Sequence, residues 1–275
     1  LGTIVAISSY ASYFWQPIMN LGNIFNNFIN NIAYLERIFE TMDEPVTVKD
    51  AENAVKMPEI RGEVTFDHVN FSYDESKQIL KDVSFTVKPG ESVALVGPTG
   101  AGKSTIVNLI SRFYNVNGGR VLIDGQDISQ VTIHSLREQM GIMMQDSFIF
   151  SGDIEDNIRY GKLDATREEI VNASKTVCAD EFISKMPDGY QTEVRERGSM
   201  LSQGQKQLIS FARTLLSDPA ILILDEATSS IDVQTEKALQ TGLNAMLKGR
   251  TSFIIAHRLS TIRNCDKIMY IDNGG

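Results

Sequence analysis

The stretch Gly-Pro-Thr-Gly-Ala-Gly-Lys-Ser at residues 97–104 decides the fold that this sequence predicts. It has the form G-x-x-x-x-G-K-[ST], which wraps backbone N–H groups around the oxygens of a phosphate chain. An apolar run, Ser92–Val96, precedes it, and a stretch with helical spacing follows from Lys103 to about Phe113. Because the motif joins a strand to a helix, we predict an α/β fold that binds a nucleoside triphosphate.

This phosphate loop supplies three kinds of contact. Its glycines and the helix N-terminus offer backbone N–H groups, Lys103 brings a mobile positive charge to the β- and γ-phosphates, and Ser104 offers a hydroxyl to Mg²⁺. A glycine-rich turn without a ligand is the alternative, and the flanking strand and helix oppose it. The residues expected to contact the nucleotide are Gly97, Thr99, Gly100, Ala101, Gly102, Lys103, Ser104 and Thr105.

The run Ile-Leu-Ile-Leu-Asp-Glu at residues 221–226 predicts the second half of the site. Apolar residues without alternation are typical of a strand that is buried on both faces of a parallel sheet. Asp225 then emerges at the carboxyl end of the strand, where α/β sheets bind ligands, and is placed to hold Mg²⁺ through water. Glu226 follows and can polarise an attacking water, whereas a solvated carboxylate at a strand end is the alternative.

Composition limits the classes of protein to consider. The chain has 275 residues, of which 42% are hydrophobic, so it is long enough for one large domain or two small ones with a real core. A net charge of −9 argues against a general nucleic-acid-binding surface, which needs a basic face. The two cysteines, Cys178 and Cys265, have no metal-like spacing, and we expect them to be reduced and buried.

The charges are absent from the start of the chain. From Leu1 to Leu35 there is no Asp, Glu, Lys, Arg or His. Residues 1–19 are apolar and aromatic with a few small polar residues, a composition that favours a membrane helix packed against other membrane helices. From Leu21 the apolar residues recur at helical spacing opposite a row of asparagines, which predicts that the same helix continues into the cytosol. A core helix that merely lacks charge is the alternative.

The rest of the chain predicts a linker and one folded domain. We expect residues 1–40 to be the end of a transmembrane domain, 41–60 a linker, and 61–275 the nucleotide-binding domain, with helices across 153–218. Alternating residues 64–71 and 83–87 predict antiparallel strands, and 221–226, 252–256 and 268–271 predict a parallel core. The chain lacks an initiator Met and stops in a turn, so we expect membrane helices upstream and a domain end downstream.

One further motif, Leu-Ser-Gln-Gly-Gln at residues 201–205, completes a recognisable set. With the phosphate loop, the Asp-Glu strand, Gln145, Ser230-Ile-Asp232 and His257, the sequence resembles the nucleotide-binding domain of an ATP-binding cassette (ABC) protein. The charge-free helix in front resembles the last transmembrane helix of a half-transporter of the multidrug- or lipid-exporting kind. The resemblance implies a P-loop NTPase (RecA-like) core with antiparallel β and helical subdomains, preceded by a long transmembrane helix.

The resemblance also implies residue roles. Ser202, at a helix N-cap, resembles the signature residue that contacts ATP held by an opposite subunit, and Gln203 stands where the usual motif has Gly. Tyr73 resembles the aromatic residue that stacks on adenine, and Glu196 resembles part of an exporter-type segment. A packing role for Tyr73, a structural role for His257 and a plain N-cap at Ser202 are the alternatives. The implied catalytic residues are Glu226, His257 and Gln145, the implied Mg²⁺ ligands are Ser104, Gln145 and Asp225, and the further nucleotide contacts are Tyr73, Asp225, Ser202, Gly204, Gln205 and Asp232.

These features predict the ATP-hydrolysing subunit of an exporter. Its cofactors would be ATP and Mg²⁺, its partner a second half-transporter in a homodimer or heterodimer, and its substrate a small molecule, lipid or peptide. It would lie in the cell membrane with the nucleotide-binding domain in the cytoplasm. A soluble cassette ATPase of repair or translation is one alternative, which the charge-free start opposes. A regulatory protein that binds nucleotide without hydrolysis is another, which Glu226 and His257 oppose.

Overall fold

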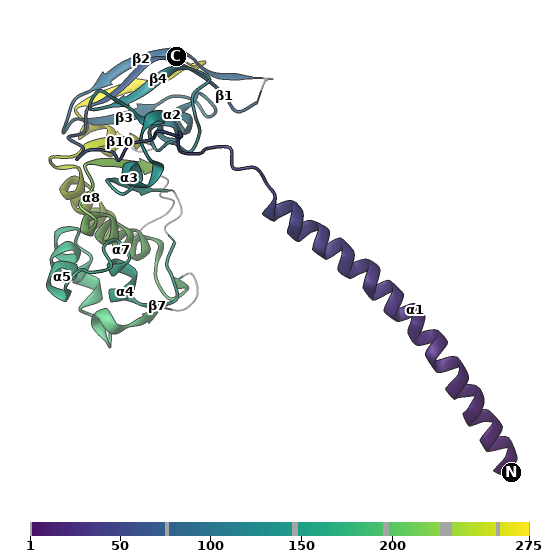
Figure 1. Ribbon diagram of the computed structural model, residues 1–275. Helices are drawn as coiled ribbons and strands as arrows, with labels where there is room; N and C mark the ends of the chain where they lie inside the picture. The colour runs from purple at the N-terminus through teal and green to yellow at the C-terminus, as the bar shows by residue number, and fades with distance from the viewer. Residues whose placement is uncertain are drawn as a thin grey trace. The chain divides into compact units, whose positions relative to one another are not determined.

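The computed structural model describes residues 2–74, 77–144, 148–194, 198–225, 233–256 and 259–274. It divides the chain into two compact units, Leu1–Thr47 and Val48–Gly275. The first unit holds one helix, and the second, which we call the cassette, holds all the described strands (Figure 1).

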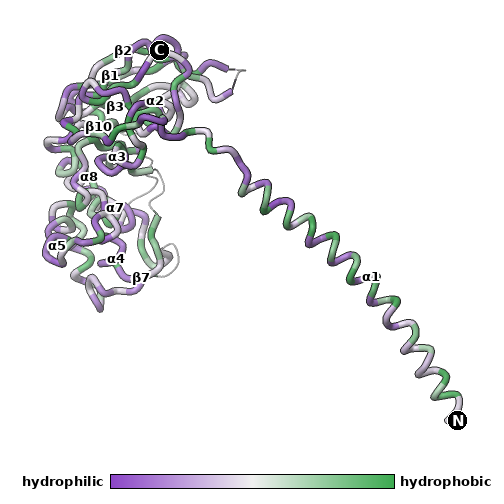
Figure 2. The backbone as a smooth tube through the Cα atoms, viewed as in Figure 1, coloured by the Kyte–Doolittle hydropathy of each residue, from purple (hydrophilic) through white to green (hydrophobic). Residues whose placement is uncertain are grey.

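The first unit is the helix α1 (Gly2–Met42), which would be about 60 Å long at 1.5 Å per residue. No side chain within it is buried, and hydrophobic and hydrophilic residues alternate along it (Figure 2). Ser9 and Ser12 donate their hydroxyls to the carbonyls of Val5 and Ser8, one turn earlier. A long N-terminal helix is therefore confirmed. Among the described helices, α1 included, none is both long enough and apolar enough to cross a membrane.

A parallel sheet forms the centre of the cassette. Its strand order is β11 (Lys267–Tyr270), β3 (Ser92–Val96), β10 (Thr251–Ile255), β9 (Ile221–Asp225), β6 (Met140–Met143), with every neighbouring pair parallel. Successive residues of β9 and β10 belong to different cores, because Ile223 and Phe253 pack on one face and Leu224 and Ile254 on the other. This double burial explains why the sequence shows continuous apolar runs without alternation.

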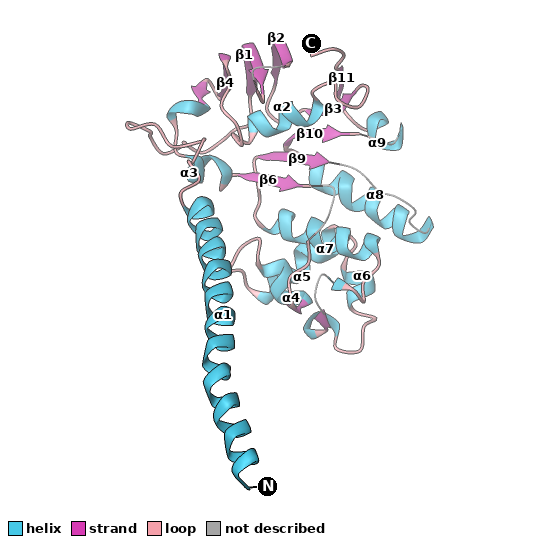
Figure 3. Ribbon diagram, turned by 90° about the vertical axis from the view of Figure 1, so that its right-hand side faces the viewer, coloured by secondary structure: helices cyan, strands magenta, loops and turns pink. Residues whose placement is uncertain are grey.

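One face of this sheet is covered by a second, antiparallel sheet and the helix α2 (Lys103–Ile110) (Figure 3). The antiparallel sheet has the order β2 (Gln78–Val87), β1 (Val64–Ser72), β4 (Gly118–Ile123), β5 (Gln126–Asp127). The alternation that predicted antiparallel strands is confirmed. The residues from Val64 to Phe71, however, form a single strand, whose pairing with β2 shifts register between Phe66 and Val69. The buried residues alternate as Val64 and Phe66 and then, one position out of phase, as Val69 and Phe71. The register shift between the two pairs lets a single strand keep both pairs facing inward.

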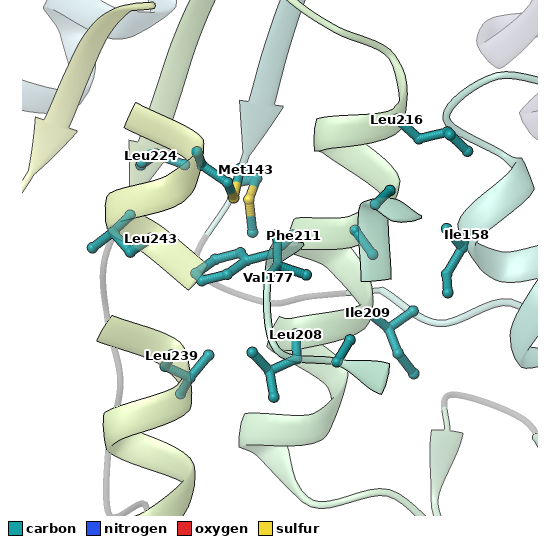
Figure 4. Close-up of a cluster of buried hydrophobic side chains, with 14 of the residues drawn as sticks. Met143, Ile158, Val177, Leu208, Ile209, Phe211, Leu216, Leu224, Leu239 and Leu243 are labelled. Carbon is teal, nitrogen blue, oxygen red and sulfur yellow. The ribbon is translucent and has the colours of Figure 1, made fainter. Parts of the chain in front are cut away.

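The other face is covered by the predicted helical subdomain. Its helices are α4 (Ile154–Arg159), α5 (Arg167–Thr176), α6 (Asp180–Ile183) and α7 (Gln203–Leu216), and α8 (Val233–Leu247), beyond the predicted range 153–218, covers the same face. Figure 4 shows Phe211 and Leu208 of α7, Leu239 and Leu243 of α8, and Leu224 of β9 gathered in one buried cluster. The remaining elements are η1 (Ile128–Gln130), α3 (Ile133–Arg137), β7 (Gly152–Asp153), η2 (Gly189–Gln191), β8 (Glu193–Val194) and α9 (Leu259–Arg263).

Two details differ from the sequence-based expectations. The helix α2 ends at Ile110 and not near Phe113, because Arg112 takes a left-handed backbone conformation (φ 51°) and Arg137 donates to the carbonyls of Ser111 and Arg112. Cys178 and Cys265 were expected to be buried, but each is only half-buried.

The part of the expected linker from Val48 onward packs on the rest of the cassette. Met57 and Ile60 are buried, and their N–H groups donate to Ser135 Oγ and Gln139 Oε1, each at 2.8 Å. Arg112, just after α2, donates to the carbonyls of Lys49 at 3.0 Å and Val131 at 2.5 Å. Burial lowers the pKa of the Arg112 guanidinium, and the nearby Asp50 carboxylate opposes this shift. Arg112 thus fastens the segment to the end of α2.

We expect Arg112→Ala to lower the free energy of unfolding by about 1.5–3 kcal/mol, because it removes charged hydrogen bonds to the carbonyls of the buried Val131 and of Lys49. The matched control is Arg120→Ala, which removes an exposed ion pair to Asp67 and should cost only about 0–1 kcal/mol. Urea unfolding of both variants, followed by circular dichroism, measures the difference. An Arg112→Ala variant no less stable than Arg120→Ala would show that this attachment is weak.

Candidate functional site

The phosphate loop lies between β3 and α2, and three of its residues need the freedom of glycine. Gly97, Gly100 and Gly102 have φ angles of 147°, 82° and 113°. A Cβ atom on Gly97 would lie 2.1 Å from the carbonyl oxygen of Ile271, and one on Gly102 would lie 2.8 Å from Leu80 Cδ2. Both the backbone conformation and the close packing therefore exclude a side chain at these two positions.

Lys103 and Ser104 open α2 with their side chains in different environments. The Lys103 ammonium donates to the carbonyls of Gly97 and Pro98, each at 2.9 Å, so it lies back across the loop. Ser104 is exposed, and Ala101 beside it is buried. Gly102 caps α2 without a side-chain bond, which leaves the N–H groups of the first turn for an anion. The loop is thus shaped to receive phosphate oxygens.

Asp225 lies at the same edge of the parallel sheet as the phosphate loop. Ile255 of β10 is opposite Leu95 of β3 on one side and opposite Asp225 on the other. The Asp225 backbone is therefore about 10 Å, or two strand spacings, from the strand that enters the loop. The half-buried Asp225 carboxylate and the Ser104 hydroxyl are both oxygen donors, the ligands that Mg²⁺ prefers. The donor set at this edge fits that ion.

Tyr73 lies at the end of β1 and contacts α2. Its hydroxyl is 3.2 Å from Thr105 Oγ1, and Asn108 Nδ2 donates to it at 3.5 Å. Its ring is half-exposed and stands nearly perpendicular to those of Phe71 and Tyr114, with both centroids 4.9 Å away. Thr105, predicted from the sequence as a nucleotide contact, is 4% exposed, and its hydroxyl is hydrogen-bonded to the Tyr73 hydroxyl.

The signature segment begins α7 on the opposite face of the sheet from α2. Ser202 Oγ accepts the N–H of Gln205 at 3.2 Å, and Gln205 Oε1 accepts the N–H of Ser202 at 2.9 Å, so the two form a capping box. Gly204 is buried in the first turn, whereas Ser202 is exposed. Within the part of the chain that the structure describes, the hydrogen bonds of Ser202 go to Gln205 and Lys206 and not to the phosphate loop of the same chain.

Several predicted site residues lie outside the described residues: Gln145, Glu196, Glu226, Asp232 and His257. Three of them follow the carboxyl ends of neighbouring parallel strands, since β6 ends at Met143, β9 at Asp225 and β10 at Ile255. The chain therefore enters these segments at the edge that carries the phosphate loop.

Arg213 of α7 is a residue that sequence reasoning missed. It donates to the carbonyls of Phe148 at 2.9 Å and Asn157 at 2.8 Å, and it lies over the rings of Phe150 and Tyr160. Burial lowers the pKa of the Arg213 guanidinium. The residue ties the signature helix to the segment that follows Gln145. No motif pointed to it, because its partners are carbonyls and rings that are distant in sequence.

The match to known families agrees with this arrangement. The family model described as ABC transporter matches residues 80–229, which run from β2 through the phosphate loop, the signature segment and the end of β9. The chain belongs to the ABC transporter family. The predicted ABC nucleotide-binding fold behind a long N-terminal helix is thereby confirmed, and the cassette is an ATP-binding domain of a family of ATP-hydrolysing transporters.

Relatives align with the whole chain of this ABC protein. YknV of Bacillus subtilis, an ABC transporter ATP-binding protein, is 53% identical over 274 residues, which cover 100% of this chain and 45% of YknV. The fatty acid ABC transporter ATP-binding/permease protein of Mycobacterium tuberculosis is 45% identical over 274 residues, which cover 100% of this chain and 43% of that protein.

A solved structure of a bacterial Atm1-family ABC exporter with ATP bound is similar with a TM-score of 0.80 and 43% identity, over 99% of this chain and 48% of the other. The chain thus spans a little under half the length of the relatives and of the structure that it matches.

We expect Lys103→Ala to weaken MgATP binding by about 10- to 150-fold, the effect of losing one charge-assisted hydrogen bond. ATP turnover should fall with it, because Lys103 is the mobile positive charge in the loop. Lys185→Ala, which removes an exposed lysine beyond the end of α6, is the matched control and should change neither quantity. Isothermal titration of MgATP and a phosphate-release assay measure both effects, and an unchanged Lys103→Ala variant would refute the assignment of the loop.

Proposed function

We propose that this chain is the ATP-hydrolysing part of an exporter half-transporter. The observation that carries the proposal is the row Leu95, Ile255 and Asp225, which brings the phosphate loop and the acidic strand end to one edge of the sheet. The relatives support the export role, since one is named a fatty acid transporter ATP-binding/permease protein and the solved neighbour an ABC exporter.

In the proposed reaction the site residues divide the binding and the chemistry of ATP among them. The N–H groups of the loop and Lys103 bind the β- and γ-phosphates, while Tyr73 stacks on the base. Ser104, Asp225 and Gln145 hold Mg²⁺, which neutralises part of the phosphate charge when it is bound. Glu226 polarises the water that attacks the γ-phosphate, and His257 orients Glu226 and contacts the γ-phosphate. These residues follow strands β1, β3, β6, β9 and β10.

The signature segment is proposed to act on a second cassette. Ser202 presents its hydroxyl and the N-terminus of α7 to solvent, away from the phosphate loop of its own chain. A helix N-terminus attracts anions, so a second copy or a different half-transporter can place its ATP there. Gly204 and Gln205 complete this surface, and Asp232 communicates across the dimer. Two ATP molecules between two cassettes would then close the dimer, and hydrolysis would open it again.

The rest of the chain is proposed to belong to the membrane part. We assign residues 1–40 to the end of the transmembrane domain, 41–60 to a linker whose part from Val48 packs on the cassette, and 61–275 to the nucleotide-binding domain in the cytoplasm. The exposed apolar side chains of α1 support packing against other membrane helices, with Tyr10 75% exposed and Trp15 60% exposed. The export substrate is then a small molecule, lipid or peptide.

We expect residues 1–275 to need detergent to stay monodisperse, whereas residues 48–275 should not, because α1 carries the large exposed apolar surface. Light scattering of both proteins with and without detergent measures the difference. If residues 1–275 are monodisperse in buffer alone, the assignment of residues 1–40 to a membrane domain is wrong.

The proposed function is tested most directly by Glu226→Gln, which keeps the size of the side chain and removes its charge. Hydrolysis should fall by about 10²- to 10⁴-fold, the usual effect of losing a general base. MgATP binding should persist because Lys103, Ser104 and Asp225 are unchanged. ATP should then remain between two cassettes, and the variant should form a stable dimer in MgATP by size exclusion with light scattering.

The control variant is Glu226→Gln with Ser202→Ala, which should still bind MgATP but dimerise less. Retained hydrolysis in Glu226→Gln would remove Glu226 from catalysis. Lost hydrolysis without a dimer would instead contradict the arrangement of two like cassettes and favour a different partner chain.

A further inference from the structure

Three aromatic rings meet where β1 ends and the segment after α2 begins. Phe71 is buried, whereas Tyr73 is 48% exposed and Tyr114 is 42% exposed. The Tyr73 ring stands nearly perpendicular to each of the others, at 86° to Phe71 and 85° to Tyr114, and Phe71 and Tyr114 are 5.7 Å apart. Edge-to-face pairs at these distances are attractive beyond their burial.

The hydroxyl end of Tyr73 is held separately from its ring. Its oxygen is 3.2 Å from Thr105 Oγ1 and 3.5 Å from Asn108 Nδ2, both on α2. These two contacts fix the position of the hydroxyl, but rotation of the ring about χ2 is restricted by other neighbours. Tyr114 supplies a second, ring-to-ring contact from outside β1. Its place is fixed in turn by the left-handed turn at Arg112 that ends α2.

We propose that Tyr114 is a positioning residue that holds the Tyr73 ring in the orientation that stacks on the base of the bound nucleotide. This inference rests on the proposed function, in which Tyr73 contacts the base. A half-exposed tyrosine that must lose rotational freedom on binding gives weaker binding than one already oriented. Tyr114 acts through Tyr73 and adds nothing to the binding of the phosphates, which is proposed to rest on the N–H groups of the loop and on Lys103.

The structure suggests how to separate this role from a general packing role. Within the described residues, the Tyr114 hydroxyl makes no hydrogen bond, so Tyr114→Phe keeps the ring contact and should behave like the parent. Tyr114→Leu keeps apolar bulk but removes the ring. Phe71 is 3% exposed and part of the core, so its substitution would disturb the fold and is not a suitable test.

The experiment measures two affinities for each variant of the 1–275 chain, one for MgATP and one for magnesium tripolyphosphate, which has phosphates but no base. Tyr114→Leu should weaken MgATP binding by about 2- to 10-fold, the range of one aromatic pair, and leave tripolyphosphate binding unchanged. Tyr114→Phe should restore the parent affinity. Tyr270→Ala, which removes an exposed tyrosine of β11, is the matched control and should change neither affinity.

A double-mutant cycle gives the sharpest result. Because Tyr114 acts through Tyr73, adding Tyr114→Leu to Tyr73→Ala should cause no further loss of MgATP affinity. Three outcomes would overturn the inference and leave the proposed function intact. Tyr114→Leu could lower MgATP affinity equally in the parent and in Tyr73→Ala, it could leave MgATP affinity unchanged, or it could weaken tripolyphosphate binding to the same extent. A parent chain that binds no MgATP, or a Tyr73→Ala variant with full affinity, would overturn the inference together with the proposed contact on which it rests.

Discussion

Burial of both faces of the parallel sheet is the constraint on which the cassette depends. The strands β3, β9 and β10 carry buried apolar side chains on both faces, and such strands are stable only when each face of the sheet is covered. Here Ile221, Ile223 and Phe253 face the antiparallel sheet and α2, while Leu222, Leu224 and Ile254 face α7 and its neighbours. One hydrophobic core therefore lies on each face of the sheet. Because both faces are covered, a binding site can form only in the loops at the ends of the strands.

The close packing of the phosphate loop follows from this sheet. The N–H of Ile271, just after β11, donates to the carbonyl of Val96 at 2.8 Å, and the Ile271 carbonyl lies where a Cβ on Gly97 would be. The same C-terminal segment accepts a hydrogen bond from the N–H of Lys81 through the Gly274 carbonyl at 2.8 Å. A glycine is thus required at position 97 by the adjacent segment around Ile271 as well as by the proposed phosphate binding.

Polar groups of the candidate site are paired with one another within the protein. Lys103 donates to two loop carbonyls, Thr105 is bonded to Tyr73, and Ser202 and Gln205 satisfy each other at the start of α7. Pairing of this kind avoids the cost of leaving buried donors and acceptors unsatisfied. For Lys103 the partners are carbonyls of the loop itself, so its ammonium group lies at the loop that is proposed to bind the phosphates.

The sequence by itself determined the local features whose cause is local. The glycines of residues 97–102, the continuous apolar run of β9 and the serine before α7 each predict their structure from spacing and residue type, and the strand–loop–helix unit and the capped helix are present. The family followed from the order of these motifs. The roles of Gln145, Glu226, Asp232 and His257 stay predictions, because these residues lie outside the described ranges.

Only the tertiary structure decided which distant residues meet. Three contacts join residues that are far apart in the chain. Arg112 binds the Lys49 carbonyl, Arg213 binds the Phe148 carbonyl, and the Tyr114 ring contacts the Tyr73 ring. Carbonyl groups and aromatic ring edges are the partners in these contacts, and every sequence offers many of both. A pattern of residue types therefore cannot select among them; the packing of β1, α2 and α7 around the central sheet does so.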